Sequence, residues 1–517
     1  MNPLIATFIC VCGIVAFFYL DRDNSVRTSK AIWVPTIYFC MTGSRAISAW
    51  ITGVHSVDVS TQIDGDPIAA ASFTLLLVAA AIVLFLRIRR VRPFLISNWA
   101  IIAFFAYCFV SASWSSHPDI AIKRWIKSLD DLAMCLVIVT DRQPIEALKR
   151  VISRVGYILL PISLLLIKYY GDLGRDYTPE GMIENIGVAT SKNMLGVTLF
   201  VVSLFTIWRV LALINEKKLP HRRRHLIAQL SLLLLACILL QLADSKTSTA
   251  CVLLGGFLMY VAGMRAIRIR PYRVHIICLG VFLVSGIAML TGGESYVVQA
   301  MGRQSNLSGR TDIWAALIAS APNPIIGAGF ESFWISPNVR TFQEELRKAR
   351  WYHAEFLNES HNGYLEVYLN LGIVGLVLIL IVLISGYRGA VAAYRKDPAS
   401  GALMIAIVIV SAFYSITEAG FRMLDLTWIC LLLAIFSASG IRMGAFNAQP
   451  LRLRNSRRQV AKQNSVGIDS APDNVRAFTN QSWLTRYDHA ESNSQLELPN
   501  PNTSPGFNSV LKHWTKQ

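Results

Sequence analysis

Long apolar runs recur along the whole chain and alternate with short polar segments that are rich in Arg or Gly. A helix that crosses the hydrocarbon core of a bilayer needs about 20 mostly apolar residues. The pattern therefore predicts an all-α, polytopic membrane protein with 12 or 13 transmembrane helices. Thirteen candidate segments centre on residues 3–20, 31–51, 68–86, 95–113, 119–139, 151–168, 193–214, 225–243, 248–264, 274–290, 363–386, 401–418 and 426–443.

The first and the fifth candidate segments differ from the others. The first has no basic residues ahead of its apolar core and no small-residue cleavage site after it, so we expect a retained span rather than a signal peptide. The fifth, 119–139, carries Asp130 and Asp131 and is the weakest candidate. The composition agrees with a membrane protein, because 54% of the residues are hydrophobic.

The net charge of +17 is concentrated in clusters that each join two candidate spans. Such clusters at alternate loops mark the cytoplasmic face of a membrane protein. The distribution excludes nucleic acid as a partner and indicates the lipid bilayer. It also predicts an external N-terminus and a cytoplasmic C-terminus for thirteen spans, with residues 291–362 as the largest external loop. The clusters are "RIRRVR" (87–92), "KKLPHRRRH" (217–225), "RAIRIRPYR" (265–273) and "YRGAVAAYRK" (387–396).

Three parts of the chain are predicted from this pattern. Residues 1–184 form N-terminal transmembrane helices, residues 185–443 form a transmembrane core with the loop 291–362, and residues 444–517 form a disordered cytoplasmic tail, since they are polar and rich in Asn, Ser, Gln and Pro. The nine cysteines all fall inside candidate spans without metal-ligand spacing, which favours small apolar core residues.

The external loop 291–362 carries most of the candidate chemistry. Thr311 or Asp312 can cap a short helix in "TDIWAALIASA", and "PNPIIGAGF" is typical of a tight turn beside a cavity. Loops longer than about 60 residues escape the positive-inside rule. Arginines such as Arg303 and Arg310 therefore indicate a site that binds an anion, because a guanidinium binds anions through paired hydrogen bonds.

Two short motifs and the end of the loop add further candidates on the external face. "ATSKNMLG" places Lys192 and Asn193 at the start of the seventh span, and "QLADSKTSTA" places Lys246 in a turn between the eighth and ninth spans. Both lysines can equally be residues that extend to the membrane surface. "ESHNGYLEVYLN" places His361 and Asn362 at the start of the eleventh span, where Asn362 can simply cap the helix.

These residue types together suit glycosyl transfer from a lipid pyrophosphate to a hydroxyl group. A histidine can accept a proton from an alcohol, and cations held at the membrane surface can neutralise a pyrophosphate leaving group. Glu355, Glu359 and His353 are alternatives to His361 as the base. The sequence contains no DxD motif placed for a metal and no His, Cys and Asp ligand cluster, so we expect no metal and no cofactor.

The ordered motifs resemble the O-antigen ligase and Wzy-type polymerase superfamily. The resemblance covers roughly residues 185–440 and rests on "SKNMLG", "ADSKTSTA", "SGRTDIWAALIASAPNPIIGAGFESFW" and "HNGYLEVYLNLGIVG". "GSRAISAWI" (43–51) and "SASWSSHPDIAIKRWIK" (111–127) look like the exopolysaccharide branch, the succinoglycan-type polymerases. The resemblance implies a GT-C-like helical fold in the bacterial inner membrane, with short helices in the large periplasmic loop. It also implies about twelve spans and cytoplasmic termini.

The resemblance further implies an inverting, metal-independent transfer of sugar from undecaprenyl pyrophosphate. Arg310 matches the loop arginine and His361 the histidine of the "HN" motif, while Lys246 replaces an arginine of the family and keeps only its charge. Arg310 and Lys246 would hold the pyrophosphate, with Lys192 and Arg303 beside them. His361 would activate or orient the acceptor hydroxyl. The expected supporting residues are Asn362, Asn193 and Glu366.

The predicted function is that of a polymerase joining undecaprenyl-pyrophosphate-linked oligosaccharide repeats, with export and chain-length proteins as further partners. A ligase that moves the glycan to lipid A core or protein uses the same chemistry and stays open. A lipid-linked oligosaccharide transporter predicts polar residues deep in many spans and repeated halves, which the sequence lacks. A scaffold without catalysis leaves the arginine-rich loop unexplained.

Overall fold

The computed structural model describes residues 2–52, 66–177, 181–215, 221–290, 308–348 and 359–446. The chain divides into two units, Met1–Asn447 and Ala448–Gln517, and the second lies outside the described residues, as does nearly all of the predicted tail 444–517. The first unit is helical apart from a small hairpin of β1 (Arg175–Tyr177) and β2 (Ile183–Asn185). The all-α prediction is therefore confirmed.

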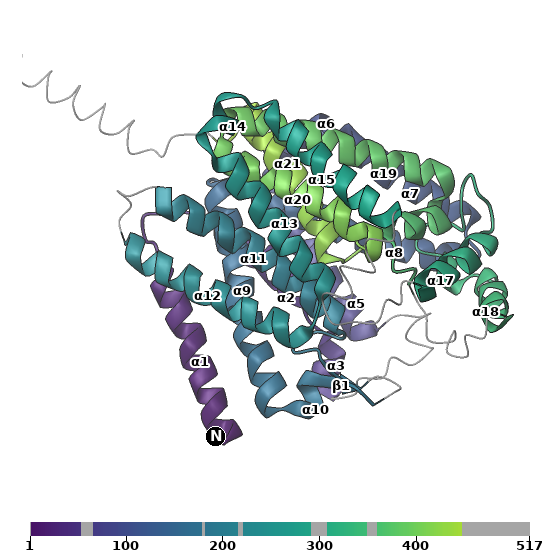
Figure 1. The fold of residues 1–517 in the computed structure, drawn as a ribbon, viewed down its shortest axis with the longest axis horizontal. Coiled ribbons are helices and arrows are strands. Elements are labelled where there is room, and N and C mark those ends of the chain that lie inside the picture. The colour runs from purple at the N-terminus through teal and green to yellow at the C-terminus, as the bar shows by residue number, and fades with distance from the viewer. Residues whose placement is uncertain are drawn as a thin grey trace, which may run out of the picture. The chain divides into compact units, whose positions relative to one another are not determined.

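The first unit consists mainly of helices that pack side by side (Figure 1). Three short 3-10 helices, η1 (Lys30–Ile32), η2 (Ala112–Trp114) and η3 (Phe333–Ile335), lie between them. The α-helices are α1 (Pro3–Leu20), α2 (Trp33–Thr42), α3 (Ile47–Thr52), α5 (Pro67–Leu86), α6 (Ile88–Ser97), α7 (Trp99–Ser111), α8 (Pro118–Val139), α9 (Pro144–Tyr169), α10 (Gly171–Gly174), α11 (Lys192–Asn215), α12 (Arg222–Ala243), α13 (Lys246–Gly263), α14 (Arg265–Ile269), α15 (Arg273–Leu290), α17 (Ser308–Ala319), α18 (Asn338–Lys348), α19 (Gly363–Lys396), α20 (Pro398–Thr417) and α21 (Leu426–Met443).

Within the described residues, nine helices are long and apolar enough to cross a membrane, or up to ten if α6 and α7–η2, bent by 88°, form one broken span. This number is below the predicted 12 or 13 for identifiable reasons. The segment 31–51 divides into the short helices α2 and α3, and 119–139 forms α8, which is long enough but carries too many charges. The segment 274–290 coincides with α15, many of whose side chains lie outside the described residues. The nine helices are α1, α5, α9, α11, α12, α13, α19, α20 and α21.

Several helices begin where the sequence provides both a cap and a proline. Asp66 accepts a hydrogen bond from the Ile68 N–H before α5, and Asp397 accepts from the Ala399 and Ser400 N–H groups before α20. A proline occupies the first turn of both helices, where its missing N–H costs nothing. These helix ends therefore follow directly from local sequence.

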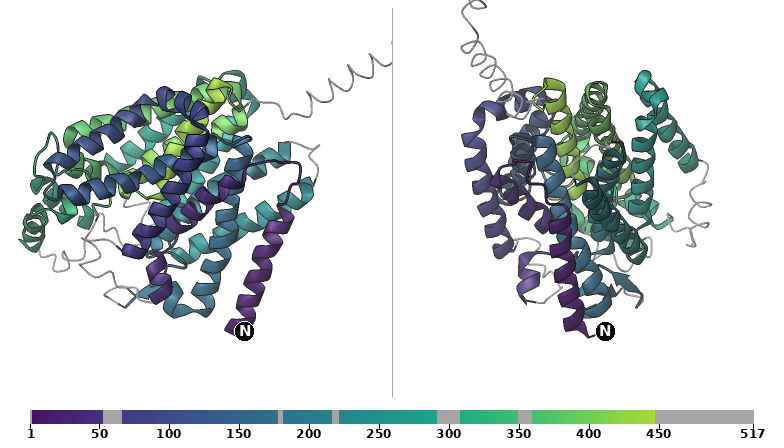
Figure 2. Two further views of the ribbon diagram at one scale, coloured as in Figure 1. Left: turned by 180° about the vertical axis from the view of Figure 1, so that it is seen from behind. Right: turned by 90° about the vertical axis from the view of Figure 1, so that its left-hand side faces the viewer.

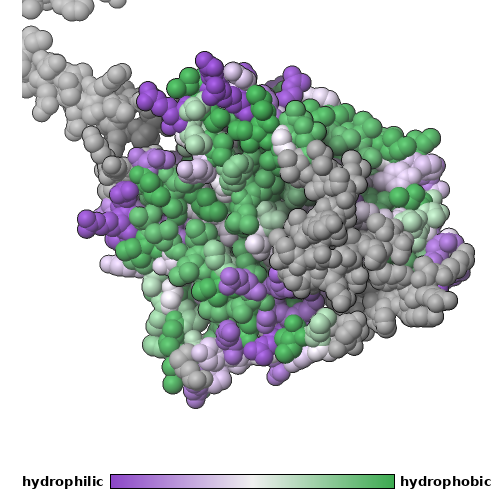
Figure 3. All heavy atoms as spheres, in the orientation of Figure 1, coloured by the Kyte–Doolittle hydropathy of each residue, from purple (hydrophilic) through white to green (hydrophobic). Residues whose placement is uncertain are grey.

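The buried centre of the unit lies in its C-terminal half. Of the apolar window of each helix, 89% is buried in α21 and 83% in α20, but only 6% in α1 and 22% in α5. Figures 1 and 2 show α1 at the edge of the bundle, and Figure 3 shows a broad hydrophobic surface over the visible face. Exposed apolar side chains on peripheral helices are what contact with lipid requires, so the exposure pattern supports a multi-pass membrane protein.

Helix α19 is broken one-quarter of the way along, and the break receives the turn "PNPIIGAGF". Gly372 has φ +64° and ψ −164°, a conformation that only glycine adopts readily. The Ile373 N–H donates to the Pro324 carbonyl at 2.8 Å, and the Gly329 N–H donates to the Asn370 carbonyl at 2.8 Å. The turn thus satisfies backbone groups that the break leaves free, and it anchors the external loop to the membrane-spanning part of α19.

Candidate functional site

A polar cavity of about 220 Å³ lies at one end of the bundle, where α11 begins and where α20 passes into α21. Its charged lining consists of Glu359, Glu418, Arg422 and Asp425. The segment between α20 and α21, residues 418–425, provides most of these groups. The other lining residues are Thr42, Ser191, Asn193, Met194, Val197, Tyr414, Ala419, Met423, Leu424 and Leu426.

His361 lies beside this cavity and is held between two carboxylates. Its Nδ1 is 2.9 Å from Oε1 of Glu359 and 3.6 Å from Oε2 of Glu418. Burial alone would lower the pKa of His361, but the contacts with the two carboxylates outweigh it and raise the pKa to about 9. The imidazole is therefore protonated at neutral pH, and it acts there as a cation rather than as a base.

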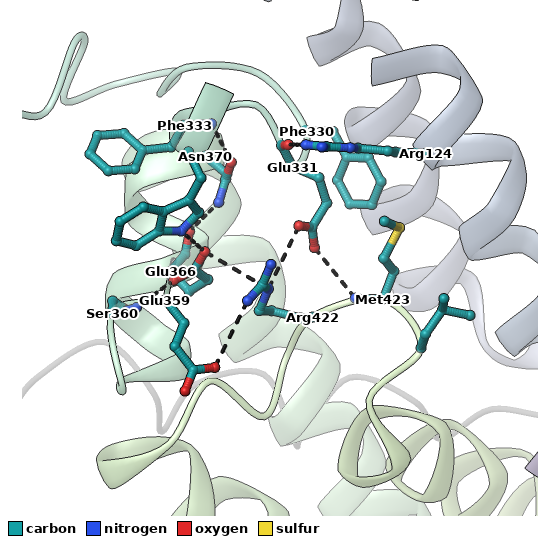
Figure 4. A network of polar contacts seen from close by, with 12 residues as sticks. Arg124, Phe330, Glu331, Phe333, Glu359, Ser360, Glu366, Asn370, Arg422 and Met423 are labelled. Carbon is teal, nitrogen blue, oxygen red and sulfur yellow. Dashed lines mark hydrogen bonds and ion pairs between the residues drawn. The ribbon is translucent and has the colours of Figure 1, made fainter. Parts of the chain in front are cut away.

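Arg422 is the central cation of the carboxylate cluster (Figure 4). Its Nε lies 3.7 Å from Oε2 of Glu331 and 4.0 Å from Oε1 of Glu366, and its Nη1 lies 3.9 Å from Oε2 of Glu359. Burial opposes its charge, yet these carboxylates raise its pKa further above the ordinary value. These distances exceed those of tight bidentate pairs, and Arg422 also lines the cavity.

Glu366 and Asn370 attach the first turns of α19 to the external loop. Glu366 accepts hydrogen bonds from the Trp334 Nε1–H at 2.6 Å and from the Ser360 N–H at 3.0 Å. The Oδ1 of Asn370 accepts from two backbone N–H groups, those of Ser332 at 2.8 Å and Phe333 at 3.0 Å. These buried bonds fix the position of the carboxylates that face Arg422.

Backbone strain is concentrated around the same cavity. In the described part of the chain, five non-glycine residues have positive φ, and three of them lie here: Glu331 (+50°), His361 (+49°) and Leu424 (+63°). Such conformations cost of order 1–3 kcal/mol each and persist where surrounding contacts determine them. The Met423 N–H donates to Oε1 of Glu331 at 3.4 Å, so two strained segments are joined directly.

Tyr38 and Asp131, a buried pair on the N-terminal helices, contact the segment 418–425. The Tyr38 hydroxyl donates to Oδ1 of Asp131 at 2.5 Å, and the Leu424 N–H donates to Oδ2 of the same carboxylate at 3.2 Å. Asp131 lies in α8 and is fully buried. The acid that made 119–139 a poor candidate span therefore holds the cavity-lining segment in place.

The structure brings some of the predicted site residues to the cavity. Asn193 lines it and donates from Nδ2 to Oε2 of Glu418 at 3.3 Å. Asn362 caps α19, accepting from the Tyr364 and Leu365 N–H groups at 3.0 Å, as the capping interpretation predicts. The predicted motifs "SKNMLG" and "ADSKTSTA" meet directly, because a side chain at Gly196 would collide with the hydroxyls of two serines in the second motif.

The predicted lysines are placed differently. Lys192 pairs with Glu184 of β2, with Nζ 2.5 Å from Oε1, and Lys246 pairs with Asp244 at 2.8 Å, with both side chains of the second pair substantially exposed. Neither lysine is among the residues that line the cavity. Arg303 lies outside the described residues. Arg310 lies in α17, but its side chain is not among those described.

The sequence interpretation missed Arg422, Glu331 and Glu418. A signal was present, because "EAGFRMLD" places three charges in a short external connection between two apolar spans. Folding brings these residues to their charged partners, which come from the loop after residue 327 and from the start of α19. The sequence alone does not show that they are neighbours. Glu359, an alternative base in the sequence interpretation, lines the cavity.

One grouping corrects the prediction that no ligand cluster is present. Glu359, His361 and Glu418 offer ligand atoms that all lie within 4.8 Å of one another, and such a set can hold a divalent cation. Glu359 and His361 are two residues apart, but Glu418 comes from the distant connection between α20 and α21, so the sequence does not reveal the grouping. Two features oppose a metal there: Arg422 lies 3.9 Å from Glu359, and an imidazole must lose its proton before it binds a metal.

Comparisons with known proteins cover part of this site, including Glu359 and His361, whereas Arg422 and Glu418 lie beyond the matched residues. The model of the family described as O-antigen ligase matches residues 230–380, which run from α12 through the external loop into α19. The chain is also similar to the exopolysaccharide production protein ExoQ of Rhizobium meliloti (strain 1021), with 27% identity over 333 residues, or 61% of this chain and 72% of that protein. The resemblance to the O-antigen ligase and polymerase superfamily, and to its exopolysaccharide branch, is confirmed.

Proposed function

We propose that this protein is an inner-membrane polymerase of exopolysaccharide. It would transfer undecaprenyl-pyrophosphate-linked oligosaccharide repeats onto one another at the periplasmic face. The family match and the relative's name support a role of the polymerase or ligase type. The observation that carries the proposal is the cavity, because it combines a guanidinium, a protonated imidazole and carboxylates at one end of a bundle of apolar helices.

The proposed reaction makes one bond and breaks one. The oxygen of an acceptor hydroxyl bonds to the anomeric carbon of the donor sugar from the face opposite the pyrophosphate, which inverts the configuration. The bond between the anomeric carbon and the pyrophosphate oxygen breaks, and its electron pair leaves with the pyrophosphate. The acceptor proton passes to a base of the protein. Developing negative charge on the leaving oxygen requires fixed cations nearby.

The described residues can be given roles in this scheme. Arg422 lines the cavity and would hold the pyrophosphate together with the Arg310 that the resemblance indicates, whereas Lys246, which the resemblance also indicates, pairs with Asp244 outside the lining. His361 would stay protonated and keep the carboxylates of Glu359 and Glu418 in position. Glu359 would accept the proton, because its side chain is 32% exposed whereas that of Glu418 is only 8% exposed.

The proposal keeps the transfer independent of metal. A guanidinium and an imidazolium already supply positive charge beside the carboxylates that a metal would need. A transporter is less well supported, because a broken helix in a transporter exposes its free backbone groups to the substrate. Here the break in α19 is filled by backbone hydrogen bonds from the turn at 324–329.

The test is a reconstituted reaction with purified protein in detergent, undecaprenyl-pyrophosphate oligosaccharide repeats and EDTA. The wild type is compared with Arg422→Gln, Arg422→Lys, His361→Ala and Arg310→Ala. We expect a ladder of longer products from the wild type and a loss of at least about 100-fold in Arg422→Gln, typical of removing one group that stabilises developing charge. Arg395→Gln, at the far end of α19, is the matched control with unchanged activity.

Each other outcome has a definite meaning. A ladder that forms only after Mg²⁺ or Mn²⁺ is added would overturn the metal-independent mechanism and favour the Glu359, His361 and Glu418 cluster as a metal site. Products that form only with a separate acceptor lipid would identify a ligase. Full activity in Arg422→Gln would remove Arg422 from the site.

A further inference from the structure

A second cavity, of about 350 Å³, lies near the other end of α19. It is enclosed by the bend between α6 and α7, by residues 381–389 of α19 and by the last turns of α21. Arg388 is 25 residues from the start of α19, or roughly 35 Å along a helix at 1.5 Å per residue. The cavity is therefore separate from the candidate site and belongs to the opposite side of the membrane.

The lining of this second cavity has a cationic, hydroxyl-bearing part and an apolar part. Arg388 and Arg442 stand with the hydroxyls of Ser97 and Ser385, whereas Ile381 and its apolar neighbours form the remaining wall. Two exposed apolar residues of this lining, Trp99 at 62% and Ile384 at 59%, open the cavity toward the apolar surface of the bundle. The other lining residues are Asn98, Ala100, Ile101, Gly389, Ile435 and Ser439.

Within the part of the chain that the structure describes, the two arginines that line this cavity have no carboxylate partner. None of the ion pairs within the described ranges includes Arg388, Lys396 or Arg442. The Lys396 Nζ donates to the backbone carbonyl of Arg442, so a further ammonium group contacts the end of α21 outside the lining. Two guanidinium groups that share one cavity and have no acid paired with them in the described ranges favour an anionic ligand.

The wall of the cavity is already organised before any ligand arrives. Asn98 occupies the bend between α6 and α7, donating from Nδ2 to the Phe94 carbonyl at 2.7 Å and accepting from the Ser439 hydroxyl at 2.7 Å. The Arg442 Nη2 donates to the Ser97 hydroxyl. These bonds connect the bend to α21 and hold the Arg442 guanidinium at the cavity. Ligand binding therefore costs little conformational entropy at this side chain.

We propose that this cavity binds an anionic phospholipid. Its phosphate lies between Arg388 and Arg442, and the start of one acyl chain runs along Ile381 and Ile384. Only a ligand that carries both a phosphate and a hydrocarbon chain uses both halves of the lining. Trp99 stands at the boundary, where indole rings of membrane proteins commonly lie. This site goes beyond the proposed transfer reaction and does not depend on it.

The test measures lipid affinity of the whole protein in detergent by native mass spectrometry. Phosphatidylglycerol is titrated against the wild type, Arg388→Gln, the double variant Arg388→Gln/Arg442→Gln and the matched control Arg395→Gln, which removes a charge from the same helix outside the cavity. We expect the single variant to weaken binding by about tenfold and the double variant by more, while Arg395→Gln binds as the wild type does.

Further titrations separate the possible sources of binding. Phosphatidylcholine tests whether the anionic charge is recognised, and glycerol phosphate tests whether the acyl chain is needed. Equal affinity for phosphatidylcholine, equal affinity for glycerol phosphate, or unchanged affinity in Arg388→Gln would each overturn the proposal. Arg388 is exposed and has no ion pair in the described structure, so its single variant retains the fold and keeps the test decisive.

Discussion

His361 gives a prediction whose sign and size follow from its surroundings. Contacts with Glu359 and Glu418 raise its pKa from the ordinary 6.5 to about 9 despite burial. A shift of this size corresponds to about 3 kcal/mol, at 1.36 kcal/mol for each pH unit. Because the folded pKa is raised, this stabilisation is fully present below pH about 6.5 and is lost as the pH rises through about 9. The side chain is only 24% exposed, so solvent screening is limited.

The measurement compares the wild type with His361→Gln by reversible unfolding in mixed micelles, followed by helical circular dichroism from pH 6 to pH 10. Other groups that titrate in this range are common to both proteins, and Arg422 beside Glu359 stays charged throughout it, because its carboxylate neighbours raise its pKa above the ordinary value. We expect the difference in unfolding free energy to shrink by about 3 kcal/mol across this range. His117→Gln is the matched control, because His117 is exposed and forms no ion pair in the described structure.

The result that would refute this reasoning is a difference between wild type and His361→Gln that stays constant with pH. The pKa of His361 would then be the same in the folded and unfolded protein, and its proposed role as a fixed cation would fail. A difference that grows with pH would mean that burial outweighs the two carboxylates. In that case His361 would regain the role of general base that the sequence interpretation allowed.

Three further substitutions test how the site is held. Asn362→Ala should cost about 0.5–2 kcal/mol of unfolding free energy through loss of the helix cap, and Asn362→Asp should not. Gly372→Ala should cost at least about 1–3 kcal/mol and abolish polymer formation, because the new Cβ would lie 2.2 Å from the Ile325 backbone, whereas Gly280→Ala, which meets nothing within 4 Å, should be tolerated. Asn370→Leu should cost roughly 1–3 kcal/mol, measured by the same unfolding assay, because it leaves the buried Phe333 N–H unbonded, while the Ser332 N–H keeps its bond to the Gly329 carbonyl.

The sequence predicts most of the fold because apolar runs and their ends are local signals. Runs such as 68–86 and 401–418 match α5 and α20 within a few residues. The prediction of membrane spans fails where a helix is surrounded by other helices rather than by lipid, because polar side chains can then be buried against protein partners. The segment 119–139 forms a full helix, yet Asp131 is stable there because Tyr38 and the Leu424 N–H bond to its carboxylate. No local pattern reveals those distant partners.

The candidate site also contains residues that the sequence locates and residues that it does not. Motif spacing locates His361 and Asn193 near the cavity, since each lies at the start of an apolar helix on the external face. It does not locate Arg422, whose three carboxylate partners come from two different segments. Sequence alone also cannot give the protonation state of His361, because that state depends on two carboxylates brought together by folding.

The charge balance of the cavity explains why the external arginines matter to the proposal. Five carboxylates, those of Glu331, Glu359, Glu366, Glu418 and Asp425, lie around Arg422 and His361, and Arg124 donates to the Glu331 backbone carbonyl nearby. Five carboxylates against these three described cations would repel a pyrophosphate unless further positive charge accompanies it. The arginines of the loop 291–362, with Arg310 first among them, are the source that the sequence offers. We therefore expect donor binding to depend on ionic strength more steeply in the wild type than in Arg310→Ala, and equal salt dependence would show that the charge is supplied in another way.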